Sequence, residues 1–295
     1  MDEHKHVFTS EGVTCEGSLY LPDADNPPVV VLGQGFGAER TMGTGGFVRA
    51  FVSAGYAVFS FDYRSFGPSA GKPRQLVHAR RHCQDWYNAV QYVRSLRSIN
   101  NQQVFLWGSS FAGGHVLVTA SRVHGLAGVI AQVPFCSSRS LARRIGIRKM
   151  IASLAHALLD TLLSLIGLQH RVALLARPGE GFALMDWPGW YESYMRIAQH
   201  SDSWVNSMPA RGIFANANYN PIDTAQHIDC PVLIISGAKD QGIPRADVLA
   251  TVEKIPRCRH VELDFDHFDL YEGFDLHEQA VALQLEFLQE SSREA

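Results

Sequence analysis

Three residues far apart in the sequence could together carry out nucleophilic catalysis: Ser110, Asp240 and His267. Serine is a poor nucleophile at neutral pH, but a histidine within hydrogen-bond reach can remove its proton and later protonate the leaving group. A carboxylate can hold that imidazole in the required tautomer and stabilise its positive form. The order Ser…Asp…His is one in which such triads occur. The three residues therefore predict acyl transfer through a covalent intermediate.

Two adjacent serines, Ser109 and Ser110, lie in a turn between an apolar stretch and a helical stretch. In a strand–turn–helix that carries a nucleophile, the residues two before and two after the nucleophile pass close together and must be small. For Ser110 these neighbours are Gly108 and Ala112; for Ser109 they would be a tryptophan and a phenylalanine. Sterics therefore favour Ser110. The alternative is a Ser/Gly-rich turn that only caps a helix.

The histidine and the acid each have competitors. Of the 13 histidines, His267 stands out because it follows the last predicted strand, 27 residues (267 − 240) after Asp240. His115 lies inside the helix after the serine, so we expect it to pack there. Asp266 and Asp269 are alternatives to Asp240 as the acid.

A glycine-rich turn at residues 33–37 follows the first fully apolar stretch. A developing oxyanion needs N–H donors that are already in place. The backbone N–H of Phe36 is a candidate donor, and that of Phe111, just after the serine at a helix N-terminus, is the second. The spacing is G-x-G-x-G rather than G-x-G-x-x-G and no P-loop lysine follows, so nucleotide binding is the less favoured interpretation.

These residues need a scaffold that brings the ends of several strands together. Strand-like stretches alternate with helical spacing, which is typical of βαβ units and a mostly parallel sheet. We therefore predict an α/β fold with a doubly wound sheet, preceded by an edge hairpin at 7–21 and closed by a helix at 279–290. The predicted buried strands cover residues 27–32, 56–62, 104–108, 128–134 and 230–237, with a short last strand at 260–264.

The alternation stops between residues 135 and 221, where no buried strand pattern is evident. Helical patterns at 147–168 and 194–214 predict a helical lid inserted into a core of residues 1–134 and 222–295. Charged residues interrupt the longer pattern, so it does not predict a membrane span. Six apolar lid residues could line a substrate pocket, although packing is the commoner use of such side chains: Met150, Leu154, Met185, Trp187, Trp190 and Tyr191.

The composition excludes several classes of function. The 295 residues fit one large domain with an insertion, or two small domains, and the net charge of −3 gives no basic surplus for nucleic acid or an anionic membrane. Five widely spaced cysteines without a C-x-x-C pair predict neither disulfides nor a zinc site. We expect no cofactor and no metal.

The charged first six residues do not resemble a signal peptide, so we expect a cytoplasmic protein. The oligomeric state is open, with a homodimer as one option.

Three motifs resemble those of the α/β-hydrolase superfamily. Residues 34–37 resemble its His-Gly oxyanion turn, with Gln34 in place of histidine. Residues 62–69 resemble its D-x-R-G-x-G-x-S loop, with a serine for the first glycine, and residues 236–244 resemble its G-x-x-D-x-x-x-P acid loop. The resemblance extends over roughly residues 7–290.

Within that superfamily, the elbow at residues 106–113 is similar to those of dienelactone-hydrolase-like and polyketide-transferase-like members. Dienelactone hydrolases proper carry a cysteine where this chain has serine. This likeness implies ester, thioester or lactone chemistry, often in secondary metabolism.

We therefore expect a serine hydrolase that cleaves a small-molecule ester or thioester, with an apolar acyl group because the predicted lid is apolar. Acyl transfer to an alcohol or amine uses the same triad and is the first alternative, and amide cleavage is another. A non-catalytic ligand-binding protein on a hydrolase scaffold is the alternative from a different class, because a fold does not fix function.

Overall fold

A computed structural model describes residues 2–294 and contains an eight-stranded sheet in the order β1-β2-β4-β3-β5-β6-β10-β11. β2 pairs antiparallel with both β1 and β4, and the other neighbours are parallel, so the predicted fold class is confirmed. The strands are β1 (Asp2–Ser10), β2 (Val13–Leu21), β3 (Pro28–Gly33), β4 (Ala57–Phe61), β5 (Asn100–Ser109), β6 (Gly128–Gln132), β10 (Val232–Gly237) and β11 (Cys258–Leu263).

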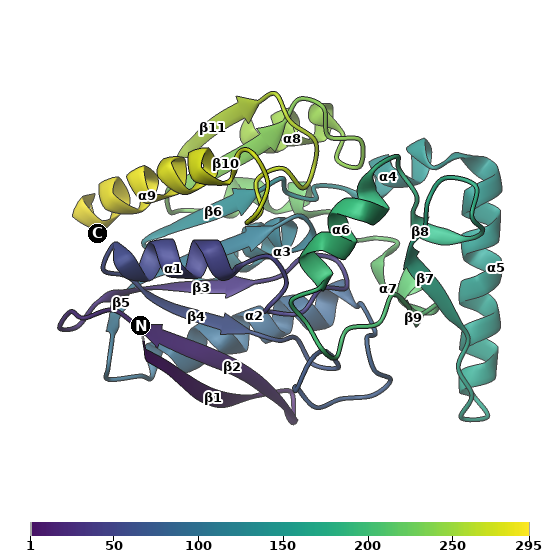
Figure 1. Cartoon of the computed structure of the whole chain (residues 1–295), viewed down its shortest axis with the longest axis horizontal. Coiled ribbons are helices and arrows are strands. Elements are labelled where there is room, and N and C mark those ends of the chain that lie inside the picture. The colour runs from purple at the N-terminus through teal and green to yellow at the C-terminus, as the bar shows by residue number, and fades with distance from the viewer. Residues whose placement is uncertain (1, 295) are drawn as a thin grey trace.

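Helices cover both faces of this sheet (Figure 1). α1 (Gly45–Ser53) and α9 (His277–Glu294) pack over one face, around the buried Trp107 of β5. α2 (Ala79–Arg94), α3 (Phe111–Ala120) and α8 (Arg245–Val252) pack over the other face. Because both faces are covered, every residue of β4, β6 and β10 is buried, which explains their continuous apolar sequences.

A segment inserted between β6 and β10 lies beyond the carboxyl ends of the parallel strands (Figure 1). It holds four helices and a small sheet in the order β8-β7-β9. Two 3₁₀ turns, Pro221–Asp223 and Ala225–His227, lead from it back to the core. In chain order its elements are α4 (Ser138–Arg144), α5 (Gly146–Ser164), β7 (Arg171–Leu175), β8 (Ala183–Met185), α6 (Trp190–Ala198), β9 (Met208–Pro209) and α7 (Gly212–Asn216).

The inserted segment differs from the sequence prediction in two respects. The helical pattern predicted over 194–214, with a break at Pro209, is wrong over residues 199–211, where a loop leads to β9, and helix resumes at Gly212 in α7. The small sheet was not predicted, because strands of two to five residues are too short for a recognisable period-2 pattern. Within residues 2–294, no helix is both long enough and apolar enough to cross a bilayer.

Candidate active site

Ser110 occupies the sharp turn between β5 and α3. Its backbone angles are φ 59° and ψ −119°, a conformation that L-residues adopt rarely and at a cost. Two main-chain hydrogen bonds to neighbouring β6 and the loop after it hold this turn: Ser110 N–H donates to Gln132 at 2.9 Å, and Phe135 N–H donates to the Ser110 carbonyl at 2.9 Å. The side chain remains partly exposed at the carboxyl edge of the sheet.

The steric argument for small neighbours matches the geometry of this turn. A Cβ added to Gly108 would lie 2.3 Å from the carbonyl oxygen of Ala112, so no larger residue fits at position 108. Ser109 points the other way and is fully buried, where Tyr271 donates to its Oγ at 2.8 Å. Burial raises the pKa of Tyr271 to about 12, which keeps that hydroxyl protonated as a donor. Of the two serines, only Ser110 has an accessible hydroxyl.

His267 connects Ser110 to Asp240. Its Nε2 lies 2.8 Å from Ser110 Oγ, and its Nδ1 lies 2.6 Å from Asp240 Oδ2. The side chains of His267 and Asp240 are only 2% and 3% exposed, so water competes little for these contacts. The other carboxylate oxygen of Asp240 accepts from the backbone N–H groups of Gly242 and Ile243, each at 2.9 Å. This arrangement presents an Nδ1–H to the carboxylate and leaves Nε2 free to accept the serine proton.

The competing acids and the competing histidine occupy other positions. Asp266 accepts from the backbone N–H of His267 at 2.8 Å and from the Gln241 amide at 2.9 Å, not from the imidazole. Asp269 accepts from the backbone N–H of Asp266 at 3.1 Å. His115 is fully buried behind the elbow, where its Nδ1 lies 2.7 Å from the Tyr219 hydroxyl.

The glycine-rich turn after β3 lies directly beside the serine. A Cβ at Gly35 would be 3.2 Å from Ser110 Cβ, so a larger residue there would push the turn and the serine apart. The rings of Phe36 and Phe111 meet edge to face, with centroids 5.2 Å apart. Within residues 2–294, neither of their backbone N–H groups donates to a protein acceptor. Both are therefore free to donate to a substrate oxygen.

Two side chains of the inserted segment hold this turn in place, and the sequence had not singled them out. The Tyr194 hydroxyl donates to the Phe36 carbonyl at 2.9 Å, and Trp204 Nε1 donates to the Gly37 carbonyl at 2.8 Å. Burial raises the pKa of Tyr194 well above its usual value, so its hydroxyl stays a donor. These two hydrogen bonds connect the inserted segment to the turn that would supply the first oxyanion donor.

The six predicted pocket residues fall into two groups. Trp190 is brought to the site: it stacks on His267 with ring centroids 4.5 Å apart, and Trp187 packs on it at 4.6 Å. Met185 and Tyr191 pack at the edge of the same core. Met150 and Leu154 belong to α5, at the outer end of the insertion, with the small sheet between α5 and the core (Figure 1). Leu154 is 45% exposed, and its position gives no support for a role in the pocket.

Further aromatic rings surround Phe111 beside the serine. Phe135 and Tyr219 lie 5.3 Å and 5.2 Å from it, centroid to centroid, and their own rings are stacked. Both are partly exposed. Sequence reasoning missed them because they are single aromatic residues in loops, without a periodic pattern. Together with Phe36 they form an apolar surface next to Ser110.

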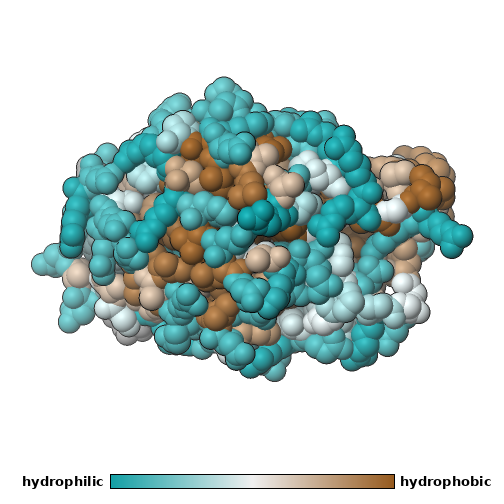
Figure 2. All heavy atoms as spheres, turned by 90° about the horizontal axis from the view of Figure 1, so that it is seen from above, coloured by the Kyte–Doolittle hydropathy of each residue, from teal (hydrophilic) through white to brown (hydrophobic). Residues whose placement is uncertain are grey.

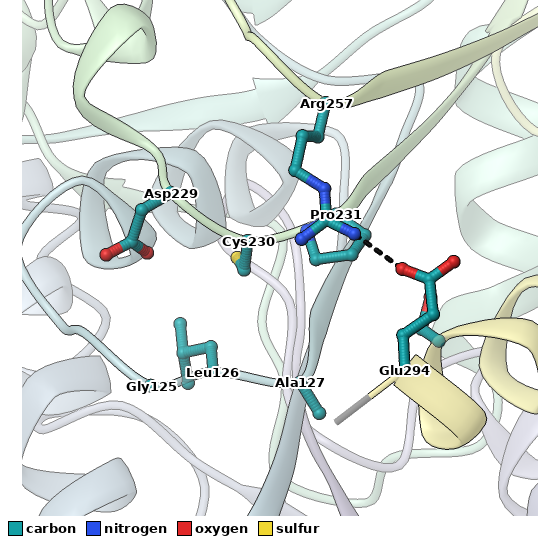
Figure 3. Close-up of a pocket in the computed structure, with 9 residues that line it drawn as sticks. Gly125, Leu126, Ala127, Asp229, Cys230, Pro231, Arg257 and Glu294 are labelled. Atoms are coloured by element: carbon teal, nitrogen blue, oxygen red, sulfur yellow. Dashed lines mark hydrogen bonds and ion pairs between the residues drawn. The ribbon is translucent and has the colours of Figure 1, made fainter.

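No second site with comparable chemistry occurs within residues 2–294. Within residues 2–294, no three His, Cys, Asp or Glu side chains gather as metal ligands would. The hollow in Figure 3 lies at the amino ends of β6 and β10, the opposite edge of the sheet from Ser110. Its charged residues already have partners, since Arg257 pairs with Glu294 at 2.5 Å and Asp229 lies 2.7 Å from His124. The hollow therefore contributes nothing to the chemistry at the serine.

Comparison with known proteins gives matches over most of the chain. A family model described as X-Pro dipeptidyl-peptidase (S15 family) matches residues 11–268. The quorum-quenching protein AidA of Acinetobacter baumannii (strain MDR-ZJ06) is 34% identical over 282 residues, which cover 95% of this chain and 92% of that protein.

Two fungal proteins show more restricted likenesses. Thiohydrolase aneE of Aspergillus aculeatus is 33% identical over 113 residues, covering 38% of this chain and 35% of that protein. The crystal structure of the α/β hydrolase GrgF from Penicillium sp. sh18 superposes with a TM-score of 0.85 over 99% of each chain, at 22% sequence identity. At that identity the likeness to GrgF concerns the fold.

Proposed function

Because the chain belongs to the α/β-hydrolase superfamily, in the family described as X-Pro dipeptidyl-peptidase (S15 family), we propose that it is a serine hydrolase of carboxylic esters or thioesters. The superfamily predicted from the motifs is confirmed. The observation that carries the proposal is the position of His267, whose two ring nitrogens lie 2.8 Å from Ser110 Oγ and 2.6 Å from Asp240 Oδ2.

In the proposed mechanism Ser110 Oγ attacks the acyl carbon while His267 Nε2 takes its proton. Asp240 holds the other ring nitrogen and stabilises the imidazolium that forms. The N–H groups of Phe36 and Phe111 donate to the oxyanion of the tetrahedral intermediate. His267 then protonates the leaving group, which departs with an acyl-enzyme left on Ser110. Water, deprotonated by the same imidazole, attacks this ester and regenerates the serine.

The surroundings of Ser110 support an apolar acyl group. Phe36, Phe135 and Tyr219 offer partly exposed, uncharged rings next to the nucleophile. Burying apolar substrate surface against such rings stabilises the complex by about 25 cal/mol per Å². The thiohydrolase among the relatives supports a thioester as one form of the substrate.

A lactone is a further substrate that the same chemistry could open, because ring opening breaks an acyl carbon–oxygen bond as ester hydrolysis does. The relative named as a quorum-quenching protein covers nearly the whole chain and supports a small signalling molecule as substrate. Acyl transfer is the alternative outcome, in which an alcohol or amine replaces water in the second step.

The proposal is tested by pre-steady-state release of p-nitrophenol from p-nitrophenyl acetate, butyrate and octanoate. We expect a burst of one equivalent per chain, larger specificity constants for the longer acyl groups, and no burst for Ser110→Ala. A medium-chain acyl-CoA and a medium-chain acyl lactone distinguish thioester and lactone substrates, and Ala-Pro-p-nitroanilide tests peptide cleavage. A protein that forms no acyl-enzyme with any of these compounds would refute the enzyme assignment and favour a ligand-binding role.

A further inference from the structure

The outer face of α5 and the turn after it expose an unusual amount of apolar surface. Figure 2 shows brown side chains gathered at the end of the molecule where α5 lies in Figure 1. Most of the large apolar side chains that are exposed within residues 2–294 belong to this one segment. We call it the α5 stripe, and its members are Ile147, Ile151, Leu154, Leu158, Leu159, Leu162, Leu165, Ile166 and Leu168.

The stripe is continuous along the helix. Six of its members follow one another at intervals of three or four residues from position 147 to position 165, and these intervals place them on the same face. At 1.5 Å per residue the face is about 27 Å long. The exposed fractions, from 44% for Leu159 to 80% for Leu165, are high throughout. The α5 stripe is therefore one elongated surface rather than scattered single residues.

The opposite face of α5 is fixed to the rest of the lid, so the stripe is not turned inward by a simple rotation of the helix. Ser153, Ala157 and Asp160 are buried there. Asp160 pairs with Arg211 at 2.8 Å and accepts the backbone N–H of His170 at 2.7 Å. These contacts hold the buried face of α5 against the rest of the protein. The stripe on the other face has no partner within residues 2–294.

We propose that the α5 stripe binds the α5 stripe of a second copy of this chain, with the two helices antiparallel about a two-fold axis. The exposed fractions correspond to roughly 900 Å² of apolar surface, above the largest patches of about 300–600 Å² on typical monomers. A standard stable interface takes about 800 Å² from each partner. In a two-fold arrangement the same self-complementary surface is buried on both copies.

Charge selects the antiparallel arrangement. Arg148 is an exposed charged residue beside the stripe, in the first turn of α5, whereas Lys149 and Asp160 on the same helix are already paired. In an antiparallel pair, Arg148 lies near the last turn of the other helix, whose unpaired carbonyls favour a cation by about 0.3–1 kcal/mol. In a parallel pair the two Arg148 guanidinium groups would instead face each other.

A lipid surface is a less suitable occupant. Helices that lie in a membrane interface combine an apolar face with a strongly basic polar face. In α5 the face opposite the stripe is packed against the protein, and Lys149 pairs with Asp186. The chain as a whole carries a net charge of −3. A second copy, which offers an equally apolar surface without a membrane's negative charge, matches the stripe better.

Sedimentation velocity of the full chain at about 20 μM tests the proposal. We expect twice the 32.7 kDa mass of one chain for the wild type. Leu158→Glu, near the middle of the stripe, should sediment as a folded monomer with a dissociation constant at least 100-fold higher. Tyr87→Glu introduces the same charge at an exposed residue of α2 and should leave the dimer intact. Circular dichroism checks that both variants are folded.

A wild type that is monomeric at this concentration would overturn the proposal. If that monomer binds vesicles of phosphatidylcholine and phosphatidylglycerol, the stripe is a lipid-binding surface instead. A dimer that survives Leu158→Glu would also refute it, because the interface would then lie elsewhere.

Oxidative cross-linking tests the orientation. Ala155→Cys, beside the expected two-fold axis, should form an intermolecular disulfide, whereas Ile147→Cys at the end of the stripe should not. The native cysteines give little background, since four of the five are buried. Efficient cross-linking of Ile147→Cys would contradict the antiparallel pairing.

Discussion

The indole of Trp190 lies against the imidazole of His267, with ring centroids 4.5 Å apart and an angle of 24° between the planes. The two residues are 77 positions apart (267 − 190) and belong to the lid and the core respectively. Trp190 is only 3% exposed, and a Cβ on Gly242 would lie 2.0 Å from its ring. The lid is thus packed onto both loops that carry the partners of Ser110.

Replacing Trp190 with leucine should lower kcat about 10-fold, because the imidazole loses the surface that holds its plane and keeps water away. KM should change less than kcat, since the loss concerns the position of His267, the proposed general base, rather than uniform substrate binding. Trp187→Leu is the matched control, because this indole packs on Trp190 and within residues 2–294 makes no ring contact with His267. Steady-state kinetics with a p-nitrophenyl ester measure both values. Equal effects of the two substitutions would contradict this role.

Tyr194→Phe should reduce kcat about fivefold. The substitution removes the hydrogen bond to the Phe36 carbonyl, worth about 1 kcal/mol, and loosens the turn that presents the Phe36 N–H. Tyr87→Phe, an exposed tyrosine on α2, serves as the control. Steady-state kinetics with the same ester give kcat and KM separately. A rise in KM at unchanged kcat would show that Tyr194 affects binding and not the oxyanion turn.

Gly108→Ala should destabilise the protein by about 1–3 kcal/mol, because the new methyl group meets the Ala112 carbonyl at 2.3 Å. The free energy of unfolding in urea measures this effect. Gly128→Ala is a matched control at a glycine of β6, where the nearest atoms would be side-chain carbons at 3.2 Å that can shift. An unchanged urea midpoint for Gly108→Ala would mean that the elbow is not as tight as this geometry requires.

His115 should make stability depend on pH in mildly acidic solution. Burial lowers the pKa of His115 from 6.5 to about 3. Below pH 6.5 the unfolded chain therefore binds a proton that the folded chain does not, and stability falls as the pH drops from 6.5 towards 3, by up to about 1.4 kcal/mol per pH unit. His115→Gln does not titrate and should reduce this slope, and the remainder comes from the other buried histidines, above all His82, whose pKa burial also lowers. Urea unfolding at pH 7, 6, 5 and 4 compares the two proteins, and parallel slopes would exclude His115 as a cause.

Local sterics and burial explain what could be predicted from the sequence. The elbow depends on residues two positions from Ser110, so Gly108 and Ala112 could be recognised directly. The parallel strands are buried on both faces, and their continuous apolar sequences follow from that. The choice among Asp240, Asp266 and Asp269 is different, because all three lie near His267 in loops and only side-chain directions separate them.

Contacts between distant segments could not be predicted. Tyr194 and Trp204 reach the turn at residues 36–37 across 158 and 167 positions of sequence. No local pattern marks either residue, since each is one aromatic side chain among many in the lid. The apolar helix at 147–168 was recognised, but its sequence alone did not distinguish a face that lines a pocket from a face that points outward. The exposure of Leu154 and its neighbours in the folded chain makes that distinction.

The proposed mechanism requires Ser110 to be the nucleophile and His267 to activate it. The most direct test is reaction with a fluorophosphonate, followed by peptide mass spectrometry of the labelled protein. We expect one phosphonyl group per chain, located on Ser110, with labelling lost in Ser110→Ala and slowed at least 100-fold in His267→Gln. A label on Ser109, or labelling that survives Ser110→Ala, would contradict it.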